Sequence, residues 1–345
     1  VNEKKLGCSL KDLVQKINNM GMEFGLWFEP EMVNEDSELY RHHPEWALNF
    51  PKRKALLDRN QLVLDLSQAR VRQYLFDRIV DILDSANVSY IKWDMNRPIT
   101  DWYSKNLSQS RQGELQHRYV LGLYKLLGRL TRRYPDVLFE GCSAGGARFD
   151  LGMLSYEPQI WTSDNTDPIN RLGIQYGTSF FYPLSTMGSH VSASPNLQNG
   201  RVTPLSTRAA VAMAGTFGYE LDVTELSDKE QQQAKEYTQF YKKIQKLTFS
   251  GDYYRLFSPF DNHNDLVAWQ IVSKDKTKCL LSVVVTNVVA NAPFVYLQLR
   301  GLDEDANYRV NDKVYSGAAL MNAGLKLGRF KGNYPSEQLY FEKIE

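Results

Sequence analysis

Short apolar runs alternate with amphipathic segments along the first 250 residues. Apolar side chains recur on one face at intervals of three or four positions, which predicts helices over residues 9–20, 68–85, 115–134 and 230–247. Apolar runs between and after these segments predict strands near residues 24–30, 88–93, 137–140, 159–162, 180–185 and 209–217. Such alternation is typical of βα units that build a parallel sheet.

The number of these units indicates a barrel that is short of two strands. A (β/α)8 barrel of the TIM type closes with eight strands, whereas the pattern supplies about six and opens on a helix. We therefore expect strands 3–8 of such a barrel in residues 1–250, with the first two units upstream of residue 1. No Gly-x-Gly-x-x-Gly phosphate turn interrupts them.

The pattern changes after residue 250. Strand-like runs separated by Lys, Asp, Asn and Gly turns replace the helices, at residues 266–272, 279–286, 294–299, 310–315 and 339–341. Residues 251–345 are therefore predicted to form a C-terminal antiparallel β-sandwich domain.

Composition narrows the classes of function. The 41 basic and 40 acidic side chains leave a formal net charge of +1, and no apolar run is as long as a membrane-spanning helix. We expect neither a nucleic acid nor a membrane as partner. Twenty Tyr, 16 Phe and 6 Trp suit the stacking of sugar faces, although a large core also uses aromatic residues.

Cysteine and histidine positions indicate a reducing compartment and no metal. Cys8, Cys142 and Cys279 lie far apart and match neither a disulfide framework nor a metal-ligand spacing. No two histidines share a ligand spacing either. We predict a cytoplasmic protein without a metal or another cofactor.

Carboxylates at the predicted strand ends are the first candidates for chemistry, because barrel enzymes place catalytic groups there. Asp94 and Asp164 each follow a strand that carries a Trp. Glycoside hydrolysis needs two such groups, one ionised and one protonated. Further carboxylates at such ends are Glu29, Glu31, Glu140 and Asp167.

Lys92, Asp94 and Asn96 alternate along one strand, so they point to the same side. A Lys and an Asp inside a barrel are costly to bury unless they pair or serve a site. The cation would keep Asp94 ionised, as a nucleophile requires. A structural ion pair is the alternative, and the polar Asn96 and Arg97 that follow favour a site.

Two other segments allow more than one interpretation. The turn Gly141–Gly146 lets backbone approach a ligand, and Cys142 within it is either an acyl-transfer nucleophile or, as we favour, a small packing residue at the rim of a site. The segment Ser163–Asp167 either carries a catalytic Asp or caps the following helix.

Five motifs resemble, in order and spacing, those of glycoside hydrolase family 36, and the microbial α-galactosidases in particular. They are Gly25 to Met32, Asp58-Arg59, Lys92 to Arg97, Cys142 to Asp150 and Trp161 to Asp167. The resemblance implies a large N-terminal β-domain, a (β/α)8 barrel and a C-terminal β-sandwich. The residues that grip O4 and O6 of the sugar are then expected upstream of Val1.

The resemblance also implies a role for each matching residue. Asp94 would be the nucleophile and Asp164 the general acid/base. The residues implied to bind substrate are Trp27, Arg59, Lys92, Asn96, Cys142, Gly145 and Trp161. Glu29, Glu31 and Asp167 would support them.

The implied activity is the retaining hydrolysis of terminal α-galactose from melibiose- or raffinose-type oligosaccharides, through a covalent glycosyl-enzyme. The two carboxyl groups should then lie about 5–5.5 Å apart. The resemblance also implies a homo-oligomer, a tetramer in the full-length family. Alternatives are an α-N-acetylgalactosaminidase or galactosyl-transferring relative, an inert carbohydrate-binding fragment and, last, a barrel enzyme acting on phosphates.

Overall fold

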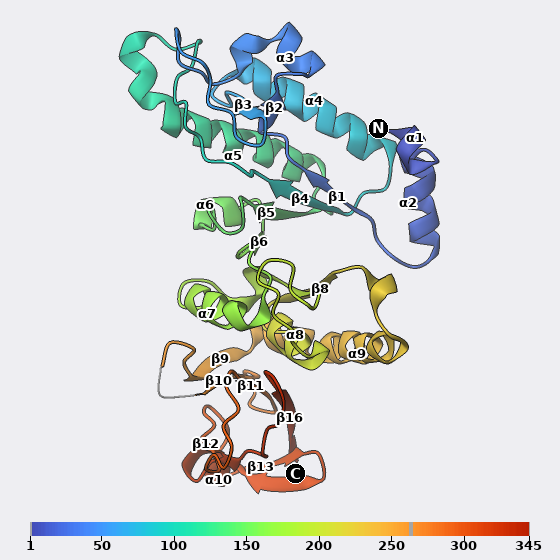
Figure 1. Ribbon diagram of the computed structural model, residues 1–345, viewed down its shortest axis with the longest axis vertical. Coiled ribbons are helices and arrows are strands. Elements are labelled where there is room, and N and C mark those ends of the chain that lie inside the picture. The colour runs from blue at the N-terminus through green and yellow to red at the C-terminus, as the bar shows by residue number, and fades with distance from the viewer. Residues whose placement is uncertain (1, 262–264, 345) are drawn as a thin grey trace. The chain divides into compact units, whose positions relative to one another are not determined.

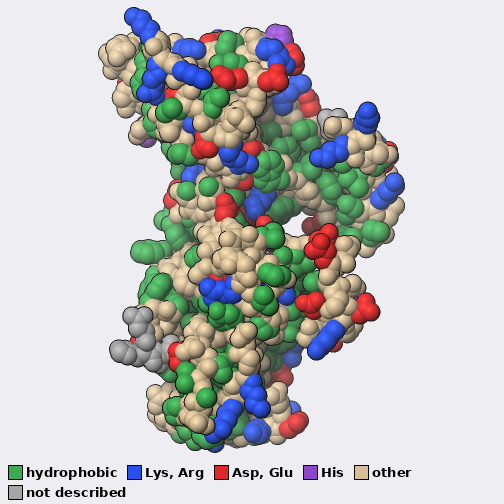
Figure 2. All heavy atoms as spheres, viewed as in Figure 1, with side chains coloured by type: hydrophobic (Ala, Val, Ile, Leu, Met, Phe, Trp, Pro, Cys, Tyr) green, Lys and Arg blue, Asp and Glu red, His purple; other side chains and the backbone are tan. Residues whose placement is uncertain are grey.

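The computed structural model describes residues 2–261 and 265–344, and the chain forms two compact units, residues 1–161 and 162–345 (Figure 1). Each unit has its own apolar core. On the face shown in Figure 2, Lys and Arg side chains are interspersed with Asp and Glu, as expected for a formal net charge of +1.

A parallel sheet organises the first unit. Its strands are β1 (Gly25–Phe28), β4 (Tyr90–Asp94), β5 (Leu138–Cys142) and β6 (Gln159–Trp161), which pair in that order. In this register Trp27 lies opposite Lys92, and Asp94 lies opposite Cys142. The carboxyl ends of the strands therefore meet at one edge, where Asp94, Cys142 and Trp161 are the last residues of β4, β5 and β6.

Amphipathic helices cover this sheet. Helices α4 (Ala69–Ser85) and α5 (Leu115–Arg133) pack side by side, and α4 buries the predicted stripe of Val71, Leu75, Ile79 and Leu83. The remaining elements of the unit are α1 (Glu3–Leu6), α2 (Leu10–Asn19), β2 (Met32–Asn34), α3 (Glu38–His42), η1 (Pro44–Trp46), β3 (Gln61–Val63), η2 (Gln109–Glu114) and α6 (Leu151–Leu154).

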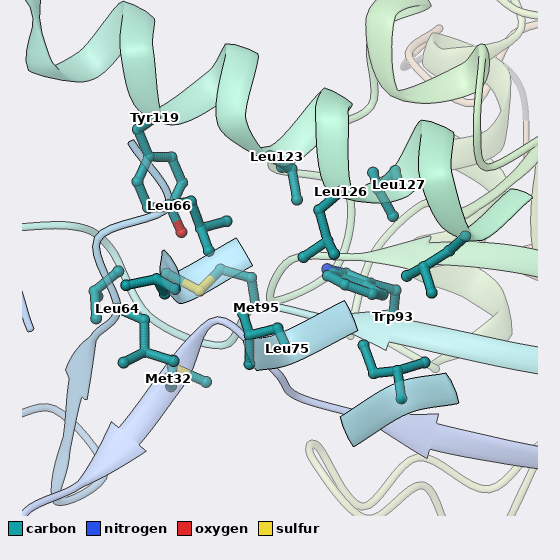
Figure 3. Packing of buried hydrophobic residues seen from close by; sticks show 14 of the residues in the cluster. Met32, Leu64, Leu66, Leu75, Trp93, Met95, Tyr119, Leu123, Leu126 and Leu127 are labelled. Carbon is teal, nitrogen blue, oxygen red and sulfur yellow. The ribbon is translucent and has the colours of Figure 1, made fainter. Parts of the chain in front are cut away.

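Trp93 is the centre of the core between sheet and helices. Side chains alternate along β4, so Trp93 faces the helices while Lys92 and Asp94 face away from them. Figure 3 shows the Trp93 indole beside Leu123, Leu126 and Leu127 of α5. The alternation of side chains predicted for this strand thus gives it a packing face, which carries Trp93, and a chemical face, which carries Lys92 and Asp94.

The second unit combines the end of the parallel α/β pattern with an antiparallel sheet. Its parallel strands β7 (Met187–Ser192) and β8 (Thr216–Glu220) pair with each other. The helices are α7 (Pro168–Thr178), η3 (Leu184–Thr186), α8 (Leu205–Ala212), η4 (Val223–Glu225) and α9 (Asp228–Ser250). Helix α9 begins with a capping box between Ser227 and Glu230.

The antiparallel sheet has the order β14-β13-β16-β11-β10-β9. Its strands are β9 (Asp252–Phe257), β10 (Leu266–Val272), β11 (Lys278–Val285), β13 (Asn307–Val310), β14 (Lys313–Ser316) and β16 (Ser336–Ile344). A second, two-stranded sheet pairs β12 (Tyr296–Leu297) with β15 (Leu325–Lys326), and α10 (Gly317–Asn322) lies between β14 and β15 in the chain.

The middle strands of this sheet are buried on both faces. Val267, Trp269 and Val284 pack with Leu172 and Val211 of the helical layer. The alternate positions of β10 and β11 join a separate apolar cluster with the C-terminal strands. This double burial explains why β10 is apolar at every position except Gln270 and shows no regular polar alternation.

Three predicted strands are wrong in detail. Residues 180–185 read as β-prone because they are aromatic, but Phe180 and Phe181 lie exposed after α7, and β7 begins only at Met187. The run at 209–217 begins inside α8, which is buried at seven of its eight positions and so shows no amphipathic period. Residues 310–315 form a hairpin, in which Asn311 turns the chain with φ 51°.

Gly122 of α5 provides a test of this packing. A Cβ atom at this position would lie 2.0 Å from the backbone oxygen of Leu66, so α5 would have to move away from the segment between β3 and α4. We expect Gly122→Ala to lower the free energy of unfolding by about 1–3 kcal/mol. Gly177→Ala in α7, where no atom lies within 4 Å, is the control and should be neutral or stabilising. Chemical denaturation measures both, and equal stabilities would contradict the packing.

Candidate active site

Asp94 ends β4 and has its carboxylate held from three directions. The Trp27 Nε1 donates to Asp94 Oδ2 at 3.0 Å, and the Asn96 Nδ2 donates to the same oxygen at 2.6 Å. The backbone N–H of Met95 donates to Oδ1 at 2.9 Å. The side chain is only slightly accessible, since Asp94 is 5% exposed. These bonds fix its orientation at the strand end, which is what a nucleophile in a barrel needs.

Trp27 combines this polar contact with an open apolar surface. The residue is 51% exposed although its indole N–H is bound to Asp94. An amphipathic ring that is anchored by its edge leaves a face free to stack on a sugar. This exposed face is available for the substrate-binding role that the family resemblance implies for Trp27.

A second layer of hydrogen bonds supports this arrangement. Glu29 Oε1 accepts from Asn96 Nδ2 at 2.8 Å and from Arg59 Nη1 at 3.1 Å. Glu29 therefore links Arg59, through Asn96, to Asp94. Arg59 has a φ of 52° and a half-exposed side chain, so part of its guanidinium remains accessible. The supporting role of Glu29 stays a prediction, and the contact through Asn96 is its route to Asp94.

Lys92 lies on the same side of β4 as Asp94 and forms an ion pair with Glu140. Its Nζ is 3.4 Å from Glu140 Oε1 and 4.8 Å from the centre of the Trp161 ring. Glu140 is fully buried and also accepts from the Tyr90 hydroxyl and the Gln159 amide. Glu140 is thus occupied in holding Lys92, which leaves Asp94 as the carboxylate of this group that faces a site. Neither Tyr90 nor Gln159 stood out in the sequence, because a single Tyr or Gln carries no motif.

Cys142 lies beside Asp94 at the end of β5. Burial, together with the nearby negative charge of Asp94, raises the pKa of the Cys142 thiol to about 12. The thiol therefore stays protonated at neutral pH and is a poor nucleophile. This argues against acyl transfer and favours the predicted role as a small residue at the rim.

The turn after β5 brings backbone toward the same edge. Ala144 and Gly145 adopt left-handed conformations with φ 47° and 86°, and the Ser143 N–H donates to the Gly145 oxygen at 2.8 Å. Gly145 pays no Cβ strain there. Trp161, the last residue of β6, is buried at 2% exposure.

Asp164 lies in the second unit, in the segment between β6 and α7. Arg171 donates to the backbone oxygens of Ser163 at 2.6 Å and Asn165 at 2.9 Å. The Gln198 Nε2 donates to the backbone oxygen of Asp164 at 2.8 Å. The backbone on both sides of Asp164 is thereby anchored.

Asp167 is the residue of this segment that caps the helix. It is fully buried at the N-cap of α7, accepts from the Ile169 N–H at 3.3 Å and pairs with Arg201 at 3.2 Å. The alternative of a helix cap thus applies to Asp167. Asp164 precedes the cap by three residues and keeps the catalytic interpretation.

Glu157 is a buried acid that sequence reasoning missed. It is 1% exposed, and neither carboxyl oxygen has a hydrogen-bond partner among the described residues. Burial raises the pKa of Glu157 to about 8, partly offset by Arg148. A Cβ atom at Gly141 would lie 2.2 Å from Glu157 Oε2, so the glycine makes room for this side chain.

Within residues 2–261 and 265–344, no group of three or more His, Cys, Asp or Glu side chains could hold a metal ion. In the same ranges, no helix is both long and apolar enough to span a membrane.

Comparisons with known proteins cover the whole chain. Residues 1–251 match the Melibiase family, and residues 266–341 match the glycosyl hydrolase family 36 C-terminal domain. The bifunctional alpha-galactosidase/sucrose kinase AgaSK of Mediterraneibacter gnavus is 52% identical over 347 residues, which are 100% of this chain and 36% of AgaSK. The alpha-galactosidase AgaA of Geobacillus stearothermophilus is 50% identical over 328 residues, which are 95% of this chain and 45% of AgaA.

Solved structures agree with these matches. The AgaA crystal structure has a TM-score of 0.97 at 48% identity and covers 100% of this chain and 48% of that one. The alpha-galactosidase of Lactobacillus brevis has a TM-score of 0.98 at 43% identity, with 100% of this chain and 48% of that one covered. The chain spans about half the length of these two proteins. The predicted family resemblance and the predicted barrel-plus-β-domain fold are confirmed.

Glu157 makes stability depend on pH. Between about pH 4.5 and pH 8 the unfolded chain loses this proton while the folded chain keeps it, so stability falls as the pH rises through that window. We expect Glu157→Gln to raise the free energy of unfolding at pH 7 by about 1–3 kcal/mol, and to have no effect below about pH 4.5.

Denaturation of both forms at several pH values measures this difference, and Glu35→Gln at an exposed position is the control. A gain from Glu157→Gln that stays constant with pH would contradict a neutral Glu157.

Proposed function

Because the chain belongs to glycoside hydrolase family 36, with residues 1–251 matching the Melibiase family, we propose that it carries the catalytic part of a retaining α-galactosidase. The substrates are oligosaccharides with terminal α-galactose, of the melibiose and raffinose type. The observation that carries the proposal is the Asp94 carboxylate, oriented by Trp27 and Asn96 at the edge where three parallel strands end.

The relatives support the substrate class. Solved structures of variants of the Geobacillus enzyme AgaA contain raffinose or stachyose, and these variants are 48% identical to the chain. Two cations belong to the same group of contacts. Lys92 pairs with Glu140 and lies over the Trp161 ring, and Arg59 pairs with Glu29, which accepts from Asn96. Such donors suit the hydroxyl groups of a sugar.

The mechanism we propose is a double displacement. Asp94 attacks the anomeric carbon while protonated Asp164 donates its proton to the leaving glycosidic oxygen, so a covalent glycosyl-enzyme forms and the alcohol departs. Asp164, now ionised, takes a proton from water, and the water oxygen displaces Asp94 with a second inversion. The anomeric configuration is retained.

Two further features belong to this proposal. The family resemblance implies assembly into a homo-oligomer, and the sparse cysteines of the sequence suit the cytoplasm. Both remain predictions, for which sedimentation of the protein and fractionation of its cells are the measurements.

Nucleophile and acid/base are distinguished by two substitutions. We expect Asp94→Gly to lower kcat by at least roughly 1,000-fold, because the attacking carboxylate is lost. Added azide should occupy the space left by the carboxylate and give the inverted β-galactosyl azide.

We expect Asp164→Gly to retain much of its activity on aryl α-galactosides with good leaving groups, because such groups need no proton to depart. With azide this variant should give the retained α-galactosyl azide.

A 2-fluoro-galactosyl reagent should label Asp94 in the unaltered protein. Asp81→Asn, on the exposed part of α4, is the control and should behave like the parent. Labelling of another residue, or azide products of the opposite configuration, would assign the roles differently.

A further inference from the structure

A buried ion pair joins the segments that surround Asp94. Glu31, in the segment after β1, is fully buried. It accepts from the Trp93 indole N–H at 2.8 Å and from the Tyr119 hydroxyl at 2.6 Å. Arg148 Nη1 lies 2.9 Å from Glu31 Oε1 and 3.1 Å from Oε2. One carboxylate thus holds strand β4, helix α5 and the chain after β5.

Arg148 carries the contact back to the turn at the site. Its Nε donates to the Ser143 hydroxyl at 2.5 Å, and Ser143 directly follows Cys142. Trp93 directly precedes Asp94 and points to the opposite face of β4. The ion pair therefore lies behind the site and touches the chain neighbours of both Asp94 and Cys142, without itself contacting Asp94.

The turn needs such an anchor. Ala144 and Gly145 are left-handed, and Gly146 follows, so the local sequence alone selects no single conformation. A planar guanidinium can donate to Ser143 and Glu31 at fixed angles at the same time. A flexible Lys ammonium cannot hold both partners in the same geometry.

Stability alone gives a weak reason for a buried ion pair, because the cost of removing both charges from water offsets much of their attraction. Neighbouring acidic side chains add to the electrostatic interactions around this ion pair. The charges of Glu31, Asp150 and Glu140 raise the pKa of the buried Glu157, whereas the charge of Arg148 lowers it. A neutral Glu157 leaves Arg148 committed to Glu31.

We propose that Arg148 is a positioning residue for Asp94: it ties the turn after β5 to Glu31, and so holds Cys142 and the turn backbone at a fixed place beside the nucleophile. This inference rests on the proposed α-galactosidase activity. Arg148 would then affect the reaction without touching the substrate.

Arg148→Lys tests the proposal. We expect kcat on an aryl α-galactoside to fall by about 10- to 100-fold with KM nearly unchanged, because a displacement of the reacting groups is felt mostly in the transition state. The labelling of Asp94 by a 2-fluoro-galactosyl reagent should slow by the same factor. Arg118→Lys, on α5 in an exposed pair with Glu114 of η2, is the matched control and should change neither rate.

The activity of a double variant distinguishes a positioning role of Arg148 from a general loss of stability. If Arg148 acts through Glu31, the double variant Glu31→Gln/Arg148→Lys should lose no more activity than the more damaged single variant. Additive losses of activity would overturn the proposal. So would a kcat that falls only in proportion to the fraction of the protein that is folded and can be labelled.

Two outcomes distinguish a failure of this inference from a failure of the proposed function. If the parent protein hydrolyses α-galactosides and Arg148→Lys matches it, only the inference fails. If the parent neither hydrolyses them nor is labelled at Asp94, the proposed function fails and the inference falls with it. Should Arg148→Lys not fold, Ser143→Ala removes only the contact to the turn, and an unchanged kcat would then overturn the proposal.

Discussion

The parallel register of β1, β4 and β5 is the constraint on which the candidate site depends. It places Trp27 opposite Lys92 and Asp94 opposite Cys142, so that side chains distant in the sequence reach one carboxylate. The pairing of β1 with β4 brings the Trp27 indole N–H within 3.0 Å of Asp94 Oδ2, and Asn96 reaches the same oxygen from the segment that follows β4. A shift by one residue would turn Asp94 toward the helices and Trp93 toward the site, so the core and the chemistry require the same register.

Burial of polar groups behind the sheet follows from the same geometry. Trp93 fills the core against α5, but its indole N–H requires an acceptor, which Glu31 supplies. The charge of Glu31 in turn requires a cation, and Arg148 comes from the turn that also approaches the site. The packing face and the chemical face of β4 are therefore coupled by a few buried contacts, although alternation places them on opposite sides.

Predictions from periodicity succeeded where a segment has one polar and one apolar face. The apolar stripe of α4 is where the sequence places it. Helix α8 was missed because burial on nearly all sides removes the polar face from which a period is read. The aromatic run after α7 was misread as a strand because β-propensity reflects packing, and these rings are exposed.

The sequence by itself determined the order of βα units, the antiparallel C-terminal part, the family and the candidates Asp94 and Asp164, because these depend on local period and on motifs in order. Only the tertiary structure decided that Glu140 is occupied by Lys92, that Asp167 is the helix cap and that the Cys142 thiol stays protonated. Each of these depends on which groups meet across strands and on how much water reaches them. Neither quantity is written in the spacing of residues along the chain.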